Sequence, residues 1–332
     1  MSNQVDIPRL GFGGSGLGNL SRAISEVQAQ QTMQAAWDGG LRYFDTSPLY
    51  GFGLSELRVG QFLRGQPRAD YKISTKVGRY MVPPRGRAYD TGMWAAPLDL
   101  MPVLDYSYDA TMRSLEQSHA RLGLADIDIV YIHDLDRRNL GTDFDRHYRV
   151  AIEGAYRALD RLRSEGFVKA IGIGVNESDV ASDFMAETDI DLVMLAGRYT
   201  LIEQPALSDC LPMAERKGVG IVNVGVFNSG VLAKGAESAT YDYGAVPGHV
   251  IEKIEVVQSI CEVFAIRMPA AAAQFSLGHP AIASVVFGMT RPGSVEQTLD
   301  YLAEDIPDAF WQALMEAGIV DVRVPMPKRS NA

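Results

Sequence analysis

Three polar side chains that can take part in proton transfer stand at the ends of short apolar runs. Asp45 ends Tyr-Phe-Asp, Lys76 ends Lys-Ile-Ser-Thr-Lys, and His133 ends Ile-Val-Tyr-Ile-His. A lysine in such a buried position needs a partner because an isolated buried ammonium is costly, and Asp45 is the natural one. Tyr50 follows five residues after Asp45. A neighbouring cation would stabilise its phenolate, so the hydroxyl could act as general acid or base. These residues predict a proton-transfer site, which would need a second group to donate or accept a hydride.

Each of these residues also has an ordinary structural explanation when taken alone. Asp45 and Lys76 could form an ion pair that closes a core, and a single His133 is more often a core histidine. The other histidines lack the spacing of a metal site, so we expect no metal. No tyrosine has a lysine four residues later, which excludes the short-chain dehydrogenase pair. The agreement of all four positions favours the catalytic interpretation.

A literal G-x-G-x-x-G pattern occurs at Gly11, Gly13 and Gly16. It binds dinucleotide phosphates only when a strand precedes it and a helix begins on its last glycines. Here the next helical pattern begins near Ser25, too late to direct its N-terminus at a phosphate. We therefore do not expect a Rossmann phosphate turn, and a turn required only by backbone geometry stays an alternative.

Eight short runs rich in β-branched residues predict the strands that position the site. They are nearly continuous in apolar residues, as in parallel strands buried on both faces. They cover residues 10–14, 43–45, 71–76, 127–133, 170–175, 192–196, 220–226 and 284–287. Eight βα units in one undivided α/β chain, residues 1–332, predict a (β/α)8 TIM barrel with its chemistry at the C-terminal strand ends. A doubly wound sheet is the second possibility.

Capping signals place helices between these runs. Ser25 and Gln28 form a capping-box pattern before a helix that ends at Asp38-Gly-Gly. Residues 109–122 and 151–165 are predicted to form helices that stop before glycines. Residues 79–104 and 230–248 are predicted as long irregular loops on the C-terminal rim, where barrels select their substrates.

The composition is that of an ordinary globular protein with a formal net charge of -10. No long run of Lys or Arg indicates nucleic-acid or membrane binding, which favours small-molecule partners. Cys210 and Cys261 are too few for a disulfide framework and are predicted to be buried thiols. With no signal peptide and no apolar run long enough to span a bilayer, we expect a cytoplasmic protein. The oligomeric state is not readable.

Asp45, Tyr50, Lys76 and His133 resemble the catalytic tetrad of the aldo-keto reductases. The similarity extends from Leu10 to about Leu299 and is strongest in Tyr43-Phe-Asp-Thr-Ser-Pro-Leu-Tyr-Gly-Phe-Gly-Leu-Ser-Glu and Val168-Lys-Ala-Ile-Gly-Ile-Gly-Val-Asn. Two further motifs are most similar to the branch of NAD-linked sugar 1-dehydrogenases and pyridoxal 4-dehydrogenase: Ala196-Gly-Arg-Tyr-Thr-Leu and Phe227-Asn-Ser-Gly-Val-Leu.

The resemblance implies where a nicotinamide cofactor binds. Gly14 and Ser15 would lie near the nicotinamide, Asn176 would bind its carboxamide although the family's usual Ser is absent, and Phe227 is the candidate stacking residue. The loop after the last strand would hold the adenosine end through Gly288, Thr290, Arg291, Ser294 and Thr298. Gly288 and Ser294 replace the Lys and Arg that bind the 2′-phosphate in many relatives. With Arg291 still nearby, we expect NAD, with NADP possible.

The resemblance implies hydride transfer between the cofactor and a hydroxyl or carbonyl carbon. The predicted substrate is a cyclic sugar hemiacetal; pyridoxal, other carbonyl compounds and a non-catalytic cofactor-sensing barrel stay open. Trp94 in the segment 79–104 is either a substrate-stacking residue or a loop anchor. Asp134 and Asp136 are expected to be solvated rim carboxylates, with polyol binding the lesser possibility.

Overall fold

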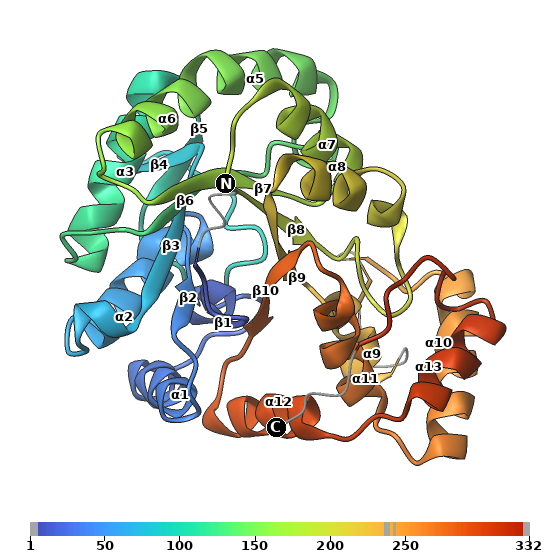
Figure 1. Ribbon diagram of the computed structural model, residues 1–332. Coiled ribbons are helices and arrows are strands. Elements are labelled where there is room, and N and C mark those ends of the chain that lie inside the picture. Colours follow the sequence, from blue (N-terminus) through green and yellow to red (C-terminus); the bar gives the residue numbers. More distant parts are fainter. Residues whose placement is uncertain (1–5, 236–239, 242–243, 328–332) are drawn as a thin grey trace.

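The computed structural model describes residues 6–235, 240–241 and 244–327 and has a closed parallel barrel at its centre (Figure 1). Its strands are β1 (Leu10–Gly13), β2 (Tyr43–Asp45), β3 (Lys72–Val77), β6 (Ile129–His133), β7 (Ala170–Val175), β8 (Leu192–Ala196), β9 (Gly220–Val224) and β10 (Ile282–Gly288). They pair in the order β1-β10-β9-β8-β7-β6-β3-β2. The (β/α)8 TIM barrel is confirmed, with strand ends shifted by one or two residues, and a doubly wound sheet is excluded.

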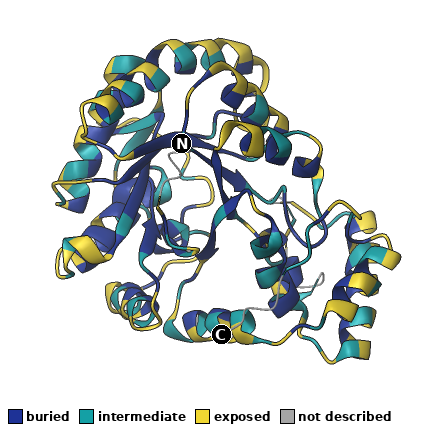
Figure 2. Ribbon diagram, in the orientation of Figure 1, coloured by how far each residue is buried: buried dark blue, intermediate teal, exposed yellow. Residues whose placement is uncertain are grey.

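Helices surround the barrel and expose their outer faces, whereas the strands are buried (Figure 2). They are α1 (Glu26–Asp38), α2 (Leu54–Leu63), α3 (Tyr108–Leu122), α4 (Arg137–Leu140), α5 (Phe144–Val150), α6 (Arg157–Ser164), α7 (Ser178–Glu187), α8 (Cys210–Lys217), α9 (Val231–Lys234), α10 (Gly248–Phe264), α11 (Met268–Phe275), α12 (Pro292–Ala303) and α13 (Asp308–Glu316). This is the helical layer that buries the outer face of a parallel barrel.

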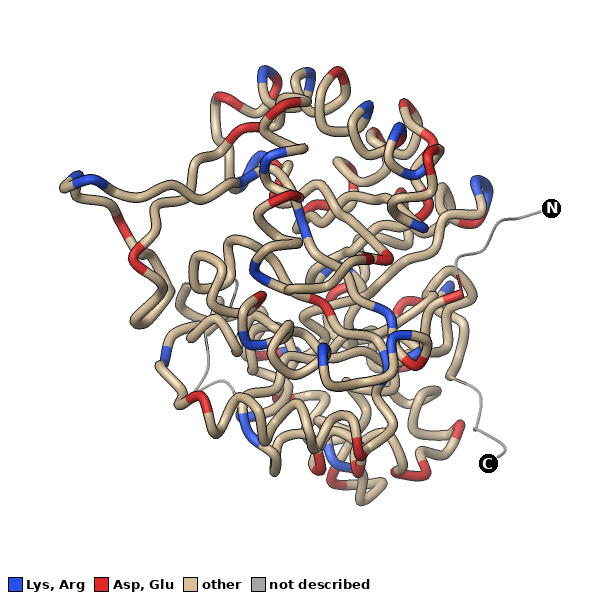
Figure 3. Tube along the Cα trace, turned by 90° about the vertical axis from the view of Figure 1, so that its left-hand side faces the viewer, with Lys and Arg blue, Asp and Glu red and all other residues tan. Residues whose placement is uncertain are grey.

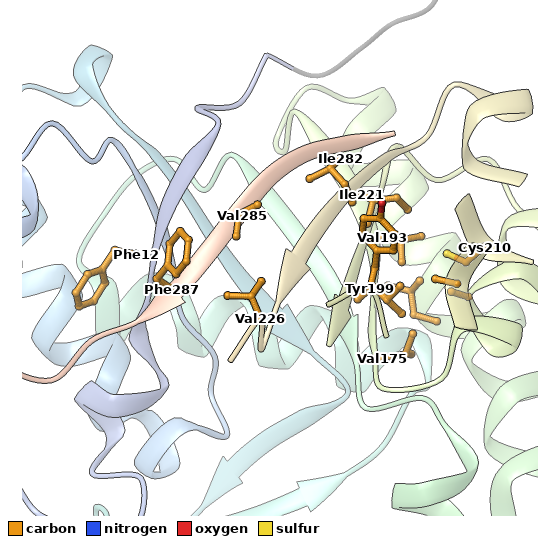
Figure 4. Packing of buried hydrophobic residues seen from close by; sticks show 14 of the residues in the cluster. Phe12, Val175, Val193, Tyr199, Cys210, Ile221, Val226, Ile282, Val285 and Phe287 are labelled. Carbon is orange, nitrogen blue, oxygen red and sulfur yellow. The ribbon is translucent and has the colours of Figure 1, made fainter. Parts of the chain in front are cut away.

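Successive side chains on each strand alternate between the barrel interior and the helical layer. Tyr43 and Tyr131 belong to the cluster inside the barrel. Phe12 belongs to the larger cluster between strands and helices, part of which Figure 4 shows. By the same alternation, Asp45 and His133, two residues after the interior tyrosines, lie on the interior side. The period-2 pattern therefore directs the strand-end polar residues into the mouth of the barrel.

The predicted helix boundaries hold at α1 and α3 and fail before α6. Ser25 Oγ accepts from the Gln28 amide at 3.1 Å, but the Gln28 side chain donates to the Thr290 carbonyl, so only half of the capping box forms. The helix predicted to begin at residue 151 begins at Phe144 and passes through a π-helical stretch, Ala151–Tyr156. There the Ala155 amide donates to the Tyr106 carbonyl at 2.9 Å, which interrupts the helical ladder.

The prediction that residues 79–104 are entirely irregular is wrong. The segment contains the antiparallel strands β4 (Arg79–Val82) and β5 (Met101–Leu104), in which Met81 faces Pro102. Proline cannot donate to a ladder, and the Gln117 side chain instead bonds both the amide and the carbonyl of Met81, each at 2.9 Å. A side chain from α3 thus satisfies the strand that the proline leaves incomplete.

The segment predicted as a loop over residues 230–248 includes helix α9 at its start, and residues 236–239 and 242–243 lie outside the described residues.

Acidic and basic residues are interspersed over the molecule in Figure 3. Both cysteines are buried as predicted, and burial raises the pKa of each thiol to about 12. Within the described ranges no single helix is long and apolar enough to cross a membrane. Only together, as a pair bent by 106°, do α10 and the segment Met268–Gly278 reach that length and apolar composition.

Candidate active site

Asp45 and Lys76 form a buried ion pair at the C-terminal end of the barrel. Lys76 Nζ lies 2.6 Å from Asp45 Oδ2 and donates to the Thr46 carbonyl at 2.9 Å. The side chain of Lys76 is 1% exposed and that of Asp45 is 4% exposed. Burial raises the pKa of the Asp45 carboxyl, and the charge of Lys76 opposes that shift. The pair predicted from the sequence is therefore present, and it fixes the ammonium group within the barrel mouth.

A second layer of polar residues lies deeper in the barrel than Asp45 and supports its carboxylate. Ser74 Oγ donates to Asp45 Oδ1 at 2.7 Å, and Tyr43 OH lies 3.0 Å from Ser74 Oγ and 3.2 Å from Tyr131 OH. Burial raises the pKa of both tyrosines far above the usual range, so both stay protonated. The sequence interpretation missed this layer, although Tyr43, Ser74 and Tyr131 each precede a site residue by two positions and so share its face.

Tyr50 is carried by a tight turn between β2 and α2. Its amide donates to the Ser47 carbonyl at 3.1 Å, and Gly51 adopts a φ of 63°, which glycine tolerates. The Tyr50 ring lies with its centroid 4.7 Å from Lys76 Nζ and 5.8 Å from the His133 ring. The four predicted residues therefore come together, with the tyrosine ring next to both the lysine and the histidine.

His133 is held at the end of β6 with its ring largely buried. Ser47 Oγ lies 3.2 Å from His133 Nδ1 and accepts from the Leu49 amide at 3.1 Å. Because His133 Nε2 lies 3.4 Å from Asp134 Oδ1, a carboxylate oxygen that only accepts, we assign the ring proton to Nε2, and Ser47 Oγ then donates to Nδ1. Burial and the charges of Lys76 and Arg79 lower the pKa of His133 well below its ordinary value. The imidazole is therefore a neutral donor at physiological pH.

Burial of neutral His133 predicts a specific loss of stability in acid. The unfolded chain takes up a proton near pH 6.5 while the folded ring does not, so folding stability decreases as the pH falls through that value. We expect the His133 contribution to reach about 1.4 kcal/mol per pH unit, so that the loss is smaller by that amount in His133→Gln; His147 and His279, whose pKa values burial also lowers, keep their own contributions. Denaturant unfolding between pH 7.5 and 5.5 would measure it, with His249→Gln, an exposed histidine, as control. Parallel curves for wild type and His133→Gln would contradict a neutral buried ring.

The glycine-rich segment after β1 forms a short 3-10 turn, Gly14–Gly18, rather than the start of an α-helix. A Cβ on Gly14 would lie 2.7 Å from the Asp45 carbonyl, and one on Gly18 would lie 2.5 Å from the Tyr50 backbone. Close packing therefore explains these glycines without a bound phosphate. By letting the turn approach both segments, they also define the positions of Asp45 and Tyr50.

Candidate cofactor residues from β1 and β10 lie side by side because these strands pair, with Gly13 opposite Gly288. A Cβ on Gly288 would lie 3.9 Å from Ser15 Oγ, and a Cβ on Gly16 would lie 2.4 Å from the Thr290 side chain. The structure thus brings Gly14, Ser15, Gly288 and Thr290 to one part of the rim.

The remaining predicted adenosine contacts lie on α12 and at its N-cap. Ser294 Oγ accepts from the Arg291 amide at 3.3 Å and donates to its carbonyl at 2.6 Å. Thr298 Oγ1 donates to the Ser294 carbonyl at 2.8 Å. Ser294 and Thr298 therefore have structural roles within their own helix, and Arg291 is the exposed cation at its N-cap.

Asn176 is locked by a carboxylate that the sequence interpretation placed in solvent. Asp136 is fully buried, so that prediction is wrong, and its Oδ2 accepts from both the amide and Nδ2 of Asn176 at 2.9 Å. Its Oδ1 accepts from the Asn139 side chain at 2.7 Å. Because Asn176 Nδ2 is engaged, Oδ1 is the atom of this side chain available to accept from a carboxamide.

The turn after β9 contains an orphaned buried polar group beside Phe227. Asn228 is 5% exposed, and among the described residues its Oδ1 atom is buried without a hydrogen-bond partner. Asn228 and Ser229 both have left-handed φ values, 46° and 58°, which are costly for residues other than glycine. Such an unsatisfied, strained turn is what a polar ligand would complete. No pattern in the sequence marks this turn beyond its position after a strand.

Trp94 lies against Tyr50 with ring centroids 5.6 Å apart and is 7% exposed. Its segment is fastened to the β1 side: Asn19 Nδ2 donates to the Ala96 carbonyl at 3.2 Å, and the Ala95 amide donates to the Asn19 carbonyl at 2.9 Å. Trp94 is therefore both a loop anchor and a wall next to Tyr50, and the two possibilities considered for it are compatible.

Comparison with known proteins agrees with this geometry. A model of the Aldo/keto reductase family matches residues 9–319. D-threo-aldose 1-dehydrogenase from Pseudomonas sp is 41% identical and pyridoxal 4-dehydrogenase from Microbacterium luteolum is 38% identical, each over 95% of both chains. A solved glycerol dehydrogenase from Gluconobacter oxydans superimposes with a TM-score of 0.71, covering 100% of this chain and 98% of that chain at 21% identity, which shows a common fold.

The first two relatives belong to the branch that the motifs beginning at Ala196 and Phe227 predict. Their similarity extends over almost the whole chain, and both are dehydrogenases at more than a third identity. The chain belongs to the aldo/keto reductase family and is an NAD(P)-dependent oxidoreductase.

Proposed function

We propose that the protein oxidises a cyclic sugar hemiacetal at its anomeric carbon, with NAD as the hydride acceptor. The observation that carries this proposal is the convergence of Tyr50, Lys76 and His133 at the barrel mouth, with Nζ 4.7 Å from the tyrosine ring centroid. The name of the 41% identical relative, D-threo-aldose 1-dehydrogenase, supports an aldose as substrate.

In the oxidative direction Tyr50, as phenolate, takes the proton of the substrate hydroxyl. Lys76 stabilises the phenolate, Asp45 holds Lys76, and His133 orients the substrate oxygen by donating from Nε2. A bound nicotinamide supplies the hydride acceptor. The unsatisfied Asn228 Oδ1 supports a polar ligand on this rim. The residues that would hold the cofactor are Gly14, Ser15, Asn176, Phe227, Gly288, Thr290 and Arg291.

Pyridoxal is the second candidate substrate, because pyridoxal 4-dehydrogenase is 38% identical over 95% of the chain. NADH formation by the purified protein with L-fucose, D-arabinose, D-galactose and pyridoxal distinguishes the two. We expect turnover of at least one aldose. Turnover of pyridoxal alone would select the second candidate. If none of the four compounds is oxidised and the protein still binds the cofactor, other carbonyl substrates or a cofactor-sensing role are favoured.

The proposed preference for NAD depends on the missing cations at Gly288 and Ser294. Ser294 caps α12, so Gly288 is the better position to change: it is exposed, and a Cβ there meets only Ser15 Oγ at 3.9 Å. We expect Gly288→Lys to raise the kcat/KM ratio of NADP to NAD about tenfold or more, through a charge-assisted contact with the 2′-phosphate.

The matched control is Gly65→Lys, which adds the same charge at an exposed glycine between α2 and β3, towards the opposite end of the barrel. Steady-state kinetics with both cofactors measure the ratio in each variant. A wild type that already uses NADP better than NAD would contradict the proposed preference. An unchanged ratio in Gly288→Lys would contradict the position assigned to the 2′-phosphate.

A further inference from the structure

Asp134 has a backbone conformation that turns its carboxylate back towards the preceding histidine. Neighbouring residues in a strand normally point to opposite sides, but Asp134 has a left-handed φ of 54°. The Asp134 amide donates to the Gly174 carbonyl at 2.9 Å, and Tyr106 OH donates to the His133 carbonyl at 2.8 Å. As a result, Asp134 Oδ1 lies 3.4 Å from His133 Nε2.

Arg79 fixes the other oxygen of this carboxylate. Its Nη1 donates to Asp134 Oδ2 at 2.9 Å, and the two side chains are 15% and 16% exposed. Arg79 begins β4, directly after Gly78, so the rim segment that carries Trp94 also carries this cation. Because Arg79 offsets the negative charge, the carboxylate can stand beside His133 without drawing a second proton onto the ring. Asp134 Oδ1 is then an oriented acceptor next to a donor.

This donor and acceptor match two oxygens on neighbouring carbon atoms. In the proposed reaction His133 Nε2 donates to the oxygen on the reacting carbon. A carboxylate only accepts, so Oδ1 requires an O–H or N–H group, and neighbouring ring hydroxyls stand roughly one hydrogen-bond length apart. We propose that Asp134, oriented by Arg79, is a specificity-determining residue that binds the hydroxyl on the carbon next to the reacting carbon.

The inference rests on the proposed function and narrows its substrate class to hemiacetals with an adjacent hydroxyl. Aldoses carry that hydroxyl at C2, whereas the ring carbon bonded to the reacting carbon of pyridoxal carries none. Asp134 therefore favours aldoses over aromatic hemiacetals. A site built to bind a hydroxyl rejects the analogue that lacks it, because Oδ1 of the partly buried Asp134 then loses that hydrogen bond.

The test combines one protein change with one substrate change. The aldose that the wild type oxidises fastest and its 2-deoxy analogue are each assayed with wild type and Asp134→Asn. Asn keeps the side-chain shape and tolerates the left-handed backbone, so the variant should fold. Asp70→Asn, an exposed position in the turn before β3, is the matched control.

We expect wild type to prefer the parent aldose over its 2-deoxy analogue by about 10- to 100-fold in kcat/KM. In Asp134→Asn this preference should fall to a few-fold, mainly because the parent sugar loses efficiency, and in Asp70→Asn it should be unchanged. The same preference in wild type and Asp134→Asn, or no preference in wild type, would overturn the inference while leaving the proposed function intact. Failure to oxidise any aldose would overturn both.

Discussion

Tyr50→Phe is expected to reduce kcat for the oxidation by about 10²- to 10⁴-fold, the usual contribution of a positioned acid–base group. The change removes one hydroxyl and keeps the ring, which lies 5.6 Å from the Trp94 ring and 5.8 Å from the His133 ring. Packing around Tyr50 should therefore be unchanged. Steady-state kinetics at saturating substrate and cofactor measure the loss.

Two controls separate chemistry from structure in this experiment. Tyr301→Phe removes a hydroxyl from the partly buried tyrosine near the end of α12, where it contacts Arg267, and should retain wild-type turnover. Cofactor affinity of Tyr50→Phe, measured by fluorescence titration, should also be unchanged. If Tyr50→Phe retains most of the wild-type turnover, the assignment of Tyr50 as the proton acceptor is contradicted.

Lys76→Met is expected to lose both activity and stability. Lys76 is 1% exposed, and its removal leaves the Asp45 carboxylate buried without its cation. Breaking a buried ion pair in this way costs about 3–5 kcal/mol in the free energy of unfolding. Turnover should fall by about 10²-fold or more, since the phenolate of Tyr50 loses its stabilising charge. Denaturant unfolding and steady-state kinetics measure the two losses separately.

The double variant Asp45→Asn/Lys76→Met separates the two roles of the pair. With both charges removed, much of the lost stability should return, because no unpaired charge is left buried. Activity should stay at the level of Lys76→Met. If activity instead recovers together with stability, the pair is only a structural closure of the barrel, and its proposed catalytic role is wrong.

The strands and three of the four tetrad positions could be predicted because they depend on local sequence patterns. Near-continuous apolar runs mark parallel strands buried on both faces, and the last polar residue of such a run lies at the barrel mouth. Asp45, Lys76 and His133 meet this rule directly. Tyr50 lies outside this rule: it was selected for its chemistry and its position five residues after Asp45, but its placement follows from a turn with a left-handed glycine at Gly51 that no periodic pattern reports.

The rim could not be predicted because its contacts join residues far apart in the chain. Gln117 completes the strand opposite Pro102, Asn19 fastens the segment that carries Trp94, and Asp136 holds Asn176 from 40 residues away. None of these pairs has a local spacing that a sequence pattern can report. For the same reason Asp136 was expected in solvent, whereas the fold buries it among its partners.

The central claim is direct hydride transfer from the substrate carbon to the cofactor. The most direct test uses the best substrate of the panel, deuterated at the reacting carbon, with NAD, and mass spectrometry of the reduced cofactor. We predict that the reduced cofactor carries the deuterium, and that its formation is slower than with unlabelled substrate when chemistry limits the rate. Reduced cofactor without deuterium, or none from any substrate of the panel, would contradict the proposed reaction.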